Sequence, residues 1–415
     1  MLGPLSLQSG PIPFRMAVPG GAGSKYEEFR AASGGLPRTE RTMKLTIERG
    51  DLLNALSHVQ NVVERRNTIP ILSNVLLQAG NGELKLTATD LDIEAVDSAD
   101  ASVSREGAVT APAGTLFDVV RKLPAGSEVE LEVQPEGQRL AITAGRSHFE
   151  LPTLPASDFQ TMSSDDTPTK FSIGAKEFAR LIDKTRFAIS TEETRYYLNG
   201  VYLHGAKTDD GSAVLRTVAT DGHRLALAEL PAPAGSENLE GIIVPRKAIA
   251  EARRLVDGVE DDIDVEVSDT KIVVRAGRAV LTSKLIDGSF PDYSRVIPKG
   301  NDKKLTIDNK AFEAAVDRVS TVSAERSRSV KMSLSDGKLV LAVNHAETGV
   351  GNEELEAEYG SDAMEIGFNA KYLLDIAGQI EAVEAEFMFS DPASPALVLD
   401  PSDDSARYVL MPLRV

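Results

Sequence analysis

The chain has 415 residues, 42% of them hydrophobic and 26% charged, and this balance excludes wholesale disorder because it is typical of domains with large cores. Its 45 Lys and Arg residues are outnumbered by 63 Asp and Glu residues, and the net charge of −18 excludes a uniformly basic nucleic-acid-binding surface. Cys is absent, which excludes disulfides, thiolate metal sites and Cys nucleophiles and is typical of a cytosolic protein. No apolar run approaches the roughly 18 residues of a membrane span.

The first 42 residues differ in composition from the rest of the chain. They are rich in Gly, Pro and Ser, show no sustained period, and lack the apolar core of about 7–15 residues that marks a secretory signal. One interpretation is a targeting segment. The other is a disordered or vector-derived extension before a natural start at Met43, and the absence of any targeting composition favours it.

Three segments of the chain open alike. Each has a short strand of alternating apolar residues, followed by an amphipathic helix with apolar residues three and four apart. The segments are MKLTIERGDLLNALSHV from Met43, TKFSIGAKEFARLIDKT from Thr169 and KKLTIDNKAFEAAVDRV from Lys303. In the first segment the apolar spacing extends the predicted helix as far as Val63.

Each segment also continues in the same way. A hairpin comes next, with a turn pair that tolerates positive φ: Asn81-Gly82, Asp210-Gly211 or Asp336-Gly337. A second helix then precedes further alternating strands. The chain is therefore predicted to be α+β, with three repeated domains at residues 43–164, 169–298 and 302–415, each made of two similar strand–helix–strands halves. A threefold repeat is more typical of a structural module than of an enzyme.

The predicted helices carry more positive charge than the strands between them. Lys176, Arg180 and Lys184 are four residues apart and share one helix face. Other basic residues lie on or beside the remaining helices: Arg65, Arg66, Arg121, Lys122, Arg246, Lys247, Arg253, Arg254, Lys310, Arg318 and Lys371. For a single helix an ordinary solvated face is explanation enough. The same bias in six helices predicts one surface that faces a polyanion.

One polar turn has residues that could carry chemistry. The segment TVATDGHRLAL places Thr220, Asp221, His223 and Arg224 together after a strand, and Asp221 with His223 could belong to a hydrolytic site. No Ser lies in a nucleophile elbow, however, and the equivalent turn TATDLDIEA has no His. We therefore interpret the segment as a turn with local Asp hydrogen bonds or as the rim of a binding site.

Neither a metal nor a cofactor is predicted. Asp90 and Asp92 are a weak cation pattern without a fuller loop, the five His residues lack zinc spacing, and no phosphate-binding Gly-rich loop occurs. The last residues, ARYVLMPLRV, are apolar to the end. They predict either simple packing of a final strand or the wall of a hydrophobic site.

Taken together, several motifs resemble those of the beta subunit of bacterial DNA polymerase III, the sliding-clamp family. They are RYYLNG from Arg195, ATDGHRLA from Ala219, VPRK from Val244, SKLIDGSFPDYSRVIPK from Ser283 and the tail MPLRV. The resemblance runs in order from Met43 to Val415. It implies a head-to-tail homodimer whose six domains close into a ring, with helices inside and sheets outside. Such a ring encircles duplex DNA without reading its sequence, slides along it, and is a non-enzymatic processivity factor.

The resemblance also implies a location and partners. The protein is expected in the bacterial cytoplasm, associated with the nucleoid during replication, with no membrane contact. Partners would be the polymerase III alpha subunit, the clamp loader, and other polymerases and repair proteins that carry short Gln/Leu/Phe motifs.

Three sets of site residues follow from the resemblance. The partner-peptide pocket would use Leu198, Thr220, Gly222, His223, Arg224, Leu225, Pro291, Arg295, Val296, Asn369, Tyr372, Val409, Leu410, Met411, Pro412, Leu413, Arg414 and Val415. The DNA-facing residues would be Arg66, Arg121, Lys176, Arg180, Lys184, Arg195, Arg246 and Lys247. The dimer interface would join Phe149 and Leu151, on an edge strand, to Thr321 and Val322 of the neighbouring copy.

The sequence departs from the family pattern at three points. Glu192 and Glu193 stand where DNA contacts are often neutral or polar, Ser327 replaces a rim aromatic, and Thr321 is less apolar than an interface Ile or Leu. Two other classes of function stay open beside the clamp: a cytosolic hydrolase that uses Asp221 and His223, and an acidic scaffold that never touches DNA.

Overall fold

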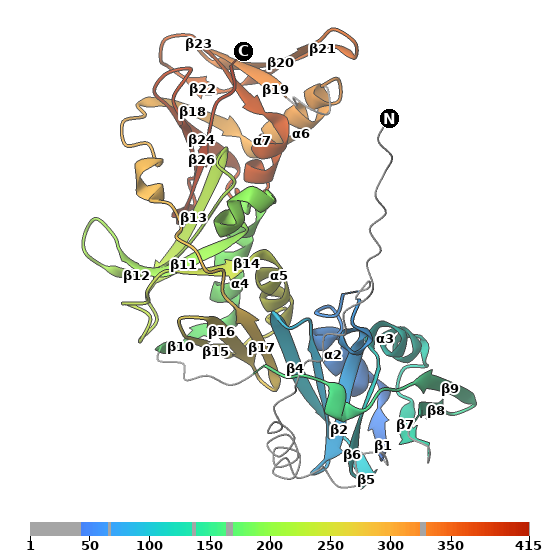
Figure 1. Cartoon of the computed structure of the whole chain (residues 1–415). Helices are drawn as coiled ribbons and strands as arrows, with labels where there is room; N and C mark the ends of the chain where they lie inside the picture. Colours follow the sequence, from blue (N-terminus) through green and yellow to red (C-terminus); the bar gives the residue numbers. More distant parts are fainter. Residues whose placement is uncertain (1–42, 65–67, 135–137, 163–168, 324–328, 415) are drawn as a thin grey trace, which may run out of the picture.

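The computed structural model describes residues 43–64, 68–134, 138–162, 169–323 and 329–414. Figure 1 shows three domains in succession along an elongated, curved chain, with α3, α5, α6 and α7 towards the concave side. The predicted leader, residues 1–42, lies outside the described residues, as do Arg65, Arg66, Ser327 and Val415.

Among its described residues, the first domain has two α-helices and nine strands. Its elements are β1 (Lys44–Glu48), α2 (Arg49–Val59), β2 (Asn74–Gly80), β3 (Glu83–Thr89), β4 (Ile93–Asp100), β5 (Ser102–Arg105), β6 (Gly107–Pro112), α3 (Ala113–Lys122), β7 (Glu128–Val133), β8 (Arg139–Ala144) and β9 (Ser147–Pro152). The first helix ends at Val59, so the extension to Val63 that the apolar spacing predicted is wrong. Val63 lies after the helix and packs on the core from there.

The second domain repeats the order of strand, helix and strands. Its elements are β10 (Thr169–Gly174), α4 (Ala175–Thr185), β11 (Gly200–Lys207), β12 (Ala213–Thr220), β13 (Arg224–Pro231), β14 (Ile242–Pro245), α5 (Arg246–Leu255), β15 (Asp262–Val267), β16 (Lys271–Ala276) and β17 (Ala279–Lys284). Its 3-10 segments include η5 (Glu193–Leu198) and η6 (Tyr293–Arg295).

The third domain follows the same plan. Its elements are β18 (Lys303–Asp308), α6 (Asn309–Ser320), β19 (Ser329–Ser335), β20 (Lys338–His345), β21 (Gly349–Glu356), β22 (Glu358–Tyr359), β23 (Met364–Asn369), α7 (Ala370–Ala377), β24 (Glu384–Phe389), β25 (Ala396–Asp400) and β26 (Asp403–Leu410). The threefold α+β repeat read from the sequence is therefore confirmed.

Local chemistry accounts for these elements. Strands such as β7 and β24 alternate buried and partly exposed residues, the period of a half-buried sheet. The β2–β3 hairpin turns at Asn81 and Gly82, whose φ values of 51° and 79° are the left-handed conformations that a two-residue hairpin loop needs. The side chains of Glu48 and Asp308 accept hydrogen bonds from the first turns of α2 and α6, as helix caps do.

Two sheets run without a break from one domain into the next. Strand β17 of the second domain pairs with β4 of the first, which makes an eight-stranded sheet. Strand β26 of the third domain pairs with β13 of the second, which makes a nine-stranded sheet. Sheets of five strands (β5-β1-β7-β8-β9) and four strands (β21-β20-β19-β23) remain at the two ends of the chain.

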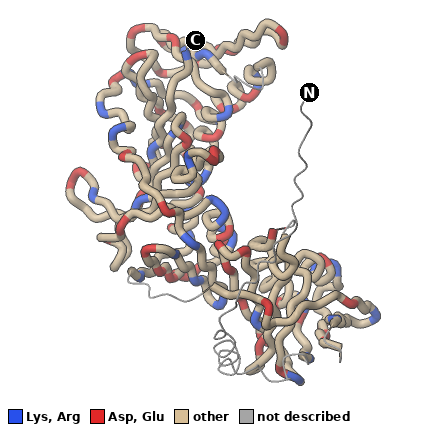
Figure 2. The backbone as a smooth tube through the Cα atoms, viewed as in Figure 1, with Lys and Arg blue, Asp and Glu red and all other residues tan. Residues whose placement is uncertain are grey.

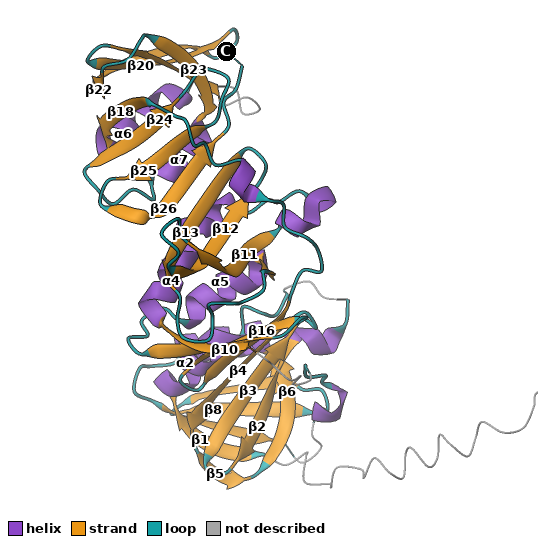
Figure 3. Cartoon of the chain, turned by 90° about the vertical axis from the view of Figure 1, so that its left-hand side faces the viewer, coloured by secondary structure: helices purple, strands orange, loops and turns teal. Residues whose placement is uncertain are grey.

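The apolar core includes buried residues of these sheets and of the helices. Figure 3 shows the helices packed along the sheets in the turned view. Phe178 and Leu181 of α4 are buried against the sheet, and burial of such side chains contributes about 1.5–3 kcal/mol each. A second, smaller apolar cluster is separate from this main core and consists of Val218, Leu225, Leu227 and Val409. No helix among the described residues is long and apolar enough to cross a membrane.

Charge follows the secondary structure in part. Each of the six described α-helices has at least as many Lys and Arg residues as Asp and Glu residues, and the excess is largest in α5. Strands such as β15 and β21 carry acidic residues instead. Figure 2 nevertheless shows acidic positions beside the basic ones in every domain, so the basic residues are not segregated from the acidic ones.

Candidate functional site

The turn between β12 and β13 is held by its own side chains. Asp221 Oδ1 accepts hydrogen bonds from the backbone N–H groups of His223 at 2.9 Å and Arg224 at 3.0 Å. Thr220 Oγ1 accepts from the Gly222 N–H and donates to the Arg224 carbonyl. This is the local Asp turn that the sequence favoured. Asp221 is thus a structural acceptor, not the orienting partner of a catalytic His223.

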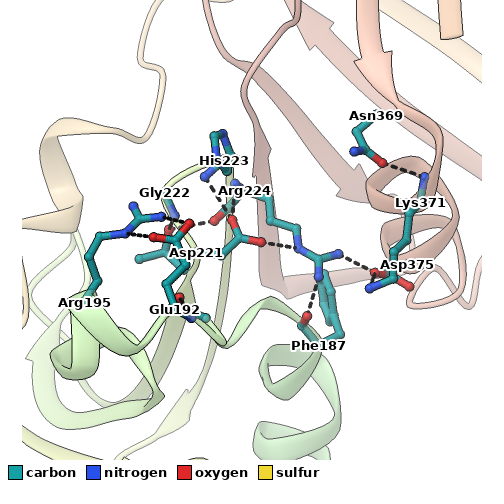
Figure 4. A network of polar contacts seen from close by, with 12 residues as sticks. Phe187, Glu192, Arg195, Asp221, Gly222, His223, Arg224, Asn369, Lys371 and Asp375 are labelled. Atoms are coloured by element: carbon teal, nitrogen blue, oxygen red, sulfur yellow. Dashed lines mark hydrogen bonds and ion pairs between the residues drawn. The ribbon is translucent and has the colours of Figure 1, made fainter. Parts of the chain in front are cut away.

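Arg224 joins the second domain to the third. Its guanidinium donates to Asp375 Oδ2 on α7 at 2.5 Å, to the Phe187 carbonyl at 2.6 Å and to Asp221 Oδ2 at 3.2 Å. The same group lies 4.4 Å from the centre of the Tyr372 ring. Figure 4 shows this arginine between the turn and α7. The prediction that Arg224 contacts a partner peptide is corrected here, because its side chain is buried and its donors already have partners within the chain.

The turn, α7 and the C-terminal tail meet where β13 begins and β26 ends, at the middle of the nine-stranded sheet. The His223 ring is exposed and stacks on Tyr372 with 6.3 Å between ring centres. The Met411 N–H donates to the His223 carbonyl at 2.9 Å, and the Leu413 N–H donates to the Gly367 carbonyl at 2.8 Å. The tail therefore bridges the second and third domains. Asn369, at the start of α7, accepts a hydrogen bond from the Lys371 N–H.

An apolar floor lies beside this meeting point. Leu225 and Val409 are cross-strand neighbours in the small cluster, and Leu397 packs on them. Pro291, Arg295 and Val296, all exposed, come from the connector between β17 and β18 that crosses this cluster.

One predicted pocket residue faces away from this floor. Leu410 is fully buried in the main core, because successive residues of a strand point to opposite faces and Val409 faces the small cluster. That prediction is wrong. Leu198 is also buried, at the end of η5. Met411, Pro412 and Leu413 are half-buried and Arg414 is exposed, whereas Val415 lies outside the described residues.

Arg195 was assigned to the DNA-facing surface but lies against the turn. A Cβ atom placed on Gly222 would lie 2.3 Å from its Nη1, so a larger residue there would displace the Arg195 side chain, and the φ of +87° itself favours glycine. Arg195 pairs with Glu192 at 2.8 Å, and a hydrogen bond from it lowers the pKa of the Glu192 carboxyl. No local pattern signals this contact, because Arg195 and Gly222 are 27 positions apart in the sequence.

Lys184 contradicts the prediction of a basic stripe on α4. Its side chain is 5% exposed, and its ammonium donates to the Gln379 carbonyl at 2.6 Å and pairs with Glu381 at 2.7 Å. Arg180 on the same helix pairs with Asp403 of the third domain. Only Lys176 of the three is well exposed, and it pairs with Glu260. Two of these cations therefore stabilise a domain junction.

Lys247 has a similar role at the other junction. Its ammonium lies 2.5 Å from Asp90 Oδ2 and donates to the Val62 carbonyl at 2.9 Å, both in the first domain. Arg121 is exposed and pairs with Asp118 one turn away. Arg246 is exposed, with no ion pair to any described residue. Arg66 lies outside the described residues.

The two end sheets each have an open edge strand. Strand β9 carries both predicted interface residues of the first domain, Phe149, which is 40% exposed, and Leu151, which is buried. At the other end of the chain the edge strand is β21, with Val350 62% exposed. Thr321 follows α6, and Val322 lies against Gly351 of β21. Sequence reasoning missed β21 itself, whose mixed Gly and Glu composition resembles a loop.

Within the described part of the chain, no three His, Asp or Glu side chains come together as metal ligands do. Asp90 makes the same local turn as Asp221, accepting from the Asp92 and Ile93 N–H groups. The weak cation pattern of the sequence is thus a second Asp turn.

Comparison with known protein families decides the identity. The models of the DNA polymerase III beta subunit match its N-terminal domain at residues 43–163, its central domain at 172–292 and its C-terminal domain at 294–414. The chain belongs to the DNA polymerase III beta subunit family. Members of this family are non-catalytic processivity factors of DNA replication, so the hydrolase alternative has no support.

Relatives match from end to end. The beta sliding clamp of Caulobacter vibrioides strain NA1000 is 58% identical over 373 residues, which is 90% of this chain and 100% of the relative. The beta sliding clamp of Escherichia coli K12 is 38% identical over 374 residues, with the same coverage.

Solved structures agree with the fold. A DNA polymerase sliding clamp from Caulobacter crescentus is 57% identical, with a TM-score of 0.85 over 90% of this chain and 100% of the other. A sliding clamp from Bartonella birtlesii, bound to griselimycin, is 48% identical, with a TM-score of 0.87 and the same coverage.

Proposed function

We propose that two copies of this chain close head to tail into a ring by pairing β9 of one copy with β21 of the other. The observation that carries this proposal is the pattern of sheets. Each internal junction joins strands of two domains into one sheet of eight or nine strands, whereas the described sheets of five and four strands each belong to a single domain and end in β9 and β21. Pairing them would make a third sheet of about nine strands and cover both edges. The exposed Phe149 and Val350 support this docking.

The ring would hold duplex DNA by encirclement. Arg246, Arg121 and Lys176 are exposed on helices and would meet phosphates weakly, without sequence information. Arg180, Lys184 and Lys247 are left out of this role because they pair with carboxylates across the domain junctions. A bore with few free cations would let the ring slide with little resistance, and the acidic remainder would repel DNA elsewhere.

Partner proteins would dock on the surface where the turn, α7 and the tail meet. Leu225 and Val409 offer a floor for Leu or Phe anchors, and Val296, Met411 and Leu413 offer adaptable apolar walls. His223 and Asn369 lie at the rim and could bind a Gln side chain or peptide backbone. The proposed ligands are the polymerase alpha subunit, the clamp loader and other partners with short Gln/Leu/Phe motifs. We also propose domain boundaries at residues 43–164, 169–298 and 302–415.

Retention on DNA tests the topological part of this function. The chain is loaded onto nicked circular DNA by a clamp loader, the circle is cut once, and bound protein is measured by gel filtration. We expect the ring to persist on circles and to be lost from the linear form. Equal retention on both forms would contradict encirclement. Association with the nucleoid is checked separately by imaging a fluorescent fusion during replication.

A further inference from the structure

The connector between the second and third domains lies across three rows of side chains on one face of the nine-stranded sheet. Leu225 and Val409 belong to the first row, and Tyr202, Val218 and Leu227 belong to the second. The third row is polar and contains His204, Arg216 and Glu229, which are directly opposite one another on β11, β12 and β13. Members of a row share a face because cross-strand partners point the same way.

Aromatic stacking fastens the connector to this face. Phe290 stacks on Tyr202 with 4.7 Å between ring centres and 2° between ring planes. Tyr293 approaches the Tyr202 and His204 rings at 6.5 Å and 5.8 Å. These contacts are apolar and fix the connector against the sheet, but they leave open how the turn η6 is oriented.

A directed chain of hydrogen bonds supplies that orientation. His204 Nδ1 lies 2.8 Å from the Gly205 carbonyl, which can only accept, so Nδ1 carries the proton and Nε2 is an acceptor. The Tyr293 hydroxyl, 2.9 Å from Nε2, therefore donates to it and accepts from Arg216 Nη1 at 3.0 Å. Glu229 accepts from Arg216 Nε at 2.7 Å and holds the guanidinium in place. Each hydrogen bond of this chain therefore joins a donor to an acceptor.

The hydrogen-bonded tyrosine stands at the base of the turn that forms one wall of the proposed peptide site. The Val296 N–H donates to the Tyr293 carbonyl at 3.0 Å, which closes η6. Val296 then projects from the turn with its side chain 41% exposed, while Ile297 returns to the small apolar cluster. A shift of the Tyr293 ring would therefore carry Val296, Arg295 and Pro291 with it.

We propose that the Tyr293 hydroxyl, held by His204 and Arg216, is a positioning group for partner-peptide binding. It sets the height and angle of the Val296 wall above the floor of Leu225 and Val409, without touching the peptide. This inference rests on the proposed peptide site and goes beyond it, because it assigns affinity to a network behind the pocket wall.

The same network should respond to pH. Burial lowers the pKa of the His204 imidazole, the Gly205 carbonyl opposes this shift, and Arg216 and Glu229 act in opposite directions. Tyr202 and Tyr293 complete the groups around the ring, and Arg407 reaches Glu229 at 3.8 Å. When His204 gains a proton, Nε2 becomes a donor beside the Arg216 cation and can no longer accept from Tyr293. Because its folded pKa is lowered, this happens only below about pH 6.5.

The experiment measures binding of a fluorescent synthetic peptide with one Gln and a Leu-Phe end by anisotropy, using the full chain at pH 7.5. Tyr293→Phe keeps the ring and removes only the hydroxyl, so we expect affinity to fall about five- to tenfold. Tyr359→Phe is the matched control, because that hydroxyl donates to the Asp362 carbonyl in the third domain, away from the connector. We expect unchanged peptide affinity in the control.

A pH series separates positioning from mere stability. In the wild type, affinity should fall between pH 7.5 and 5.5. In His204→Gln, which keeps an amide at this position but does not titrate, the part of the fall due to His204 should vanish. The exposed His223 is present in both proteins, so its contribution cancels in the comparison.

The outcomes are distinguishable. Absence of peptide binding by the wild type would overturn the proposed peptide site itself. Binding by the wild type that Tyr293→Phe leaves unchanged, or that Tyr359→Phe weakens equally, would overturn the positioning role alone. Identical pH profiles for the wild type and His204→Gln would also contradict it.

Discussion

The ammonium of Lys184 lies 2.6 Å from the carbonyl oxygen of Gln379, across the junction between the second and third domains. Lys184 belongs to α4 and Gln379 follows α7, so this hydrogen bond and the pair with Glu381 tie two helices of different domains together. The cation is buried, with Asp403 3.8 Å away. A residue that the sequence predicts to face DNA thus belongs to the junction between the second and third domains.

Replacing Lys184 with Met should destabilise this junction. The change keeps the apolar stem but leaves the Gln379 carbonyl without its donor, and a hydrogen-bonding group that loses its partner inside a junction costs about 1–3 kcal/mol. Lys176→Met on the same helix is the control, because Lys176 is 74% exposed and should change the free energy of unfolding by less than about 0.5 kcal/mol. Urea denaturation followed by circular dichroism measures both. Equal effects of the two changes would contradict a junction role.

Asp403 should make the stability of the same junction depend on pH. Burial alone would raise the pKa of this carboxyl, but hydrogen bonds from Ser405 and the neighbouring Arg180 hold it below its usual range. A lowered carboxyl pKa gives stability that is present above the unfolded value near 3.9 and is lost as pH falls through the folded value. Unfolding free energies at pH 5, 4 and 3 should therefore fall more steeply for the wild type than for Asp403→Asn. Parallel slopes would refute this linkage.

Charge on either open edge should prevent ring closure. Phe149→Asp on β9 or Val350→Asp on β21 places a carboxylate in an apolar edge contact and should shift the mass in light scattering from about twice 44.5 kDa towards 44.5 kDa. Val383→Asp is the control, because Val383 is even more exposed than Phe149 or Val350 but lies between α7 and β24, away from both edges. A dimer that survives both edge changes would show that the interface lies elsewhere.

Charge reversal of Arg246 should weaken contact with DNA without abolishing encirclement. Arg246 is the exposed first residue of α5, and each lost phosphate contact should reduce the slope of log K against log salt by about 0.9. We expect a lower slope for Arg246→Glu in equilibrium binding to short duplex DNA. Lys338→Glu, on strand β20, is the control and should keep the wild-type slope. A change in both variants alike would indicate a general effect of net charge.

The linear pattern of residues predicted the architecture well. Alternation of period two in segments such as Lys303–Asp308, helical spacing behind them and turn pairs such as Asn81-Gly82 are local signals, and their threefold recurrence specified three α+β domains. The Asp221 turn was also predictable, because its hydrogen bonds join residues two and three positions apart.

The sequence by itself therefore determined the repeat, the helix and strand types and the identity of the turn. Only the tertiary structure decided which cations are free. Lys184 and Lys247 meet their acceptors in other domains, and no spacing along the chain encodes a contact between residues more than 150 positions apart. It also decided that Val409 faces the proposed pocket and Leu410 the core, because the face of a strand depends on what packs against each side.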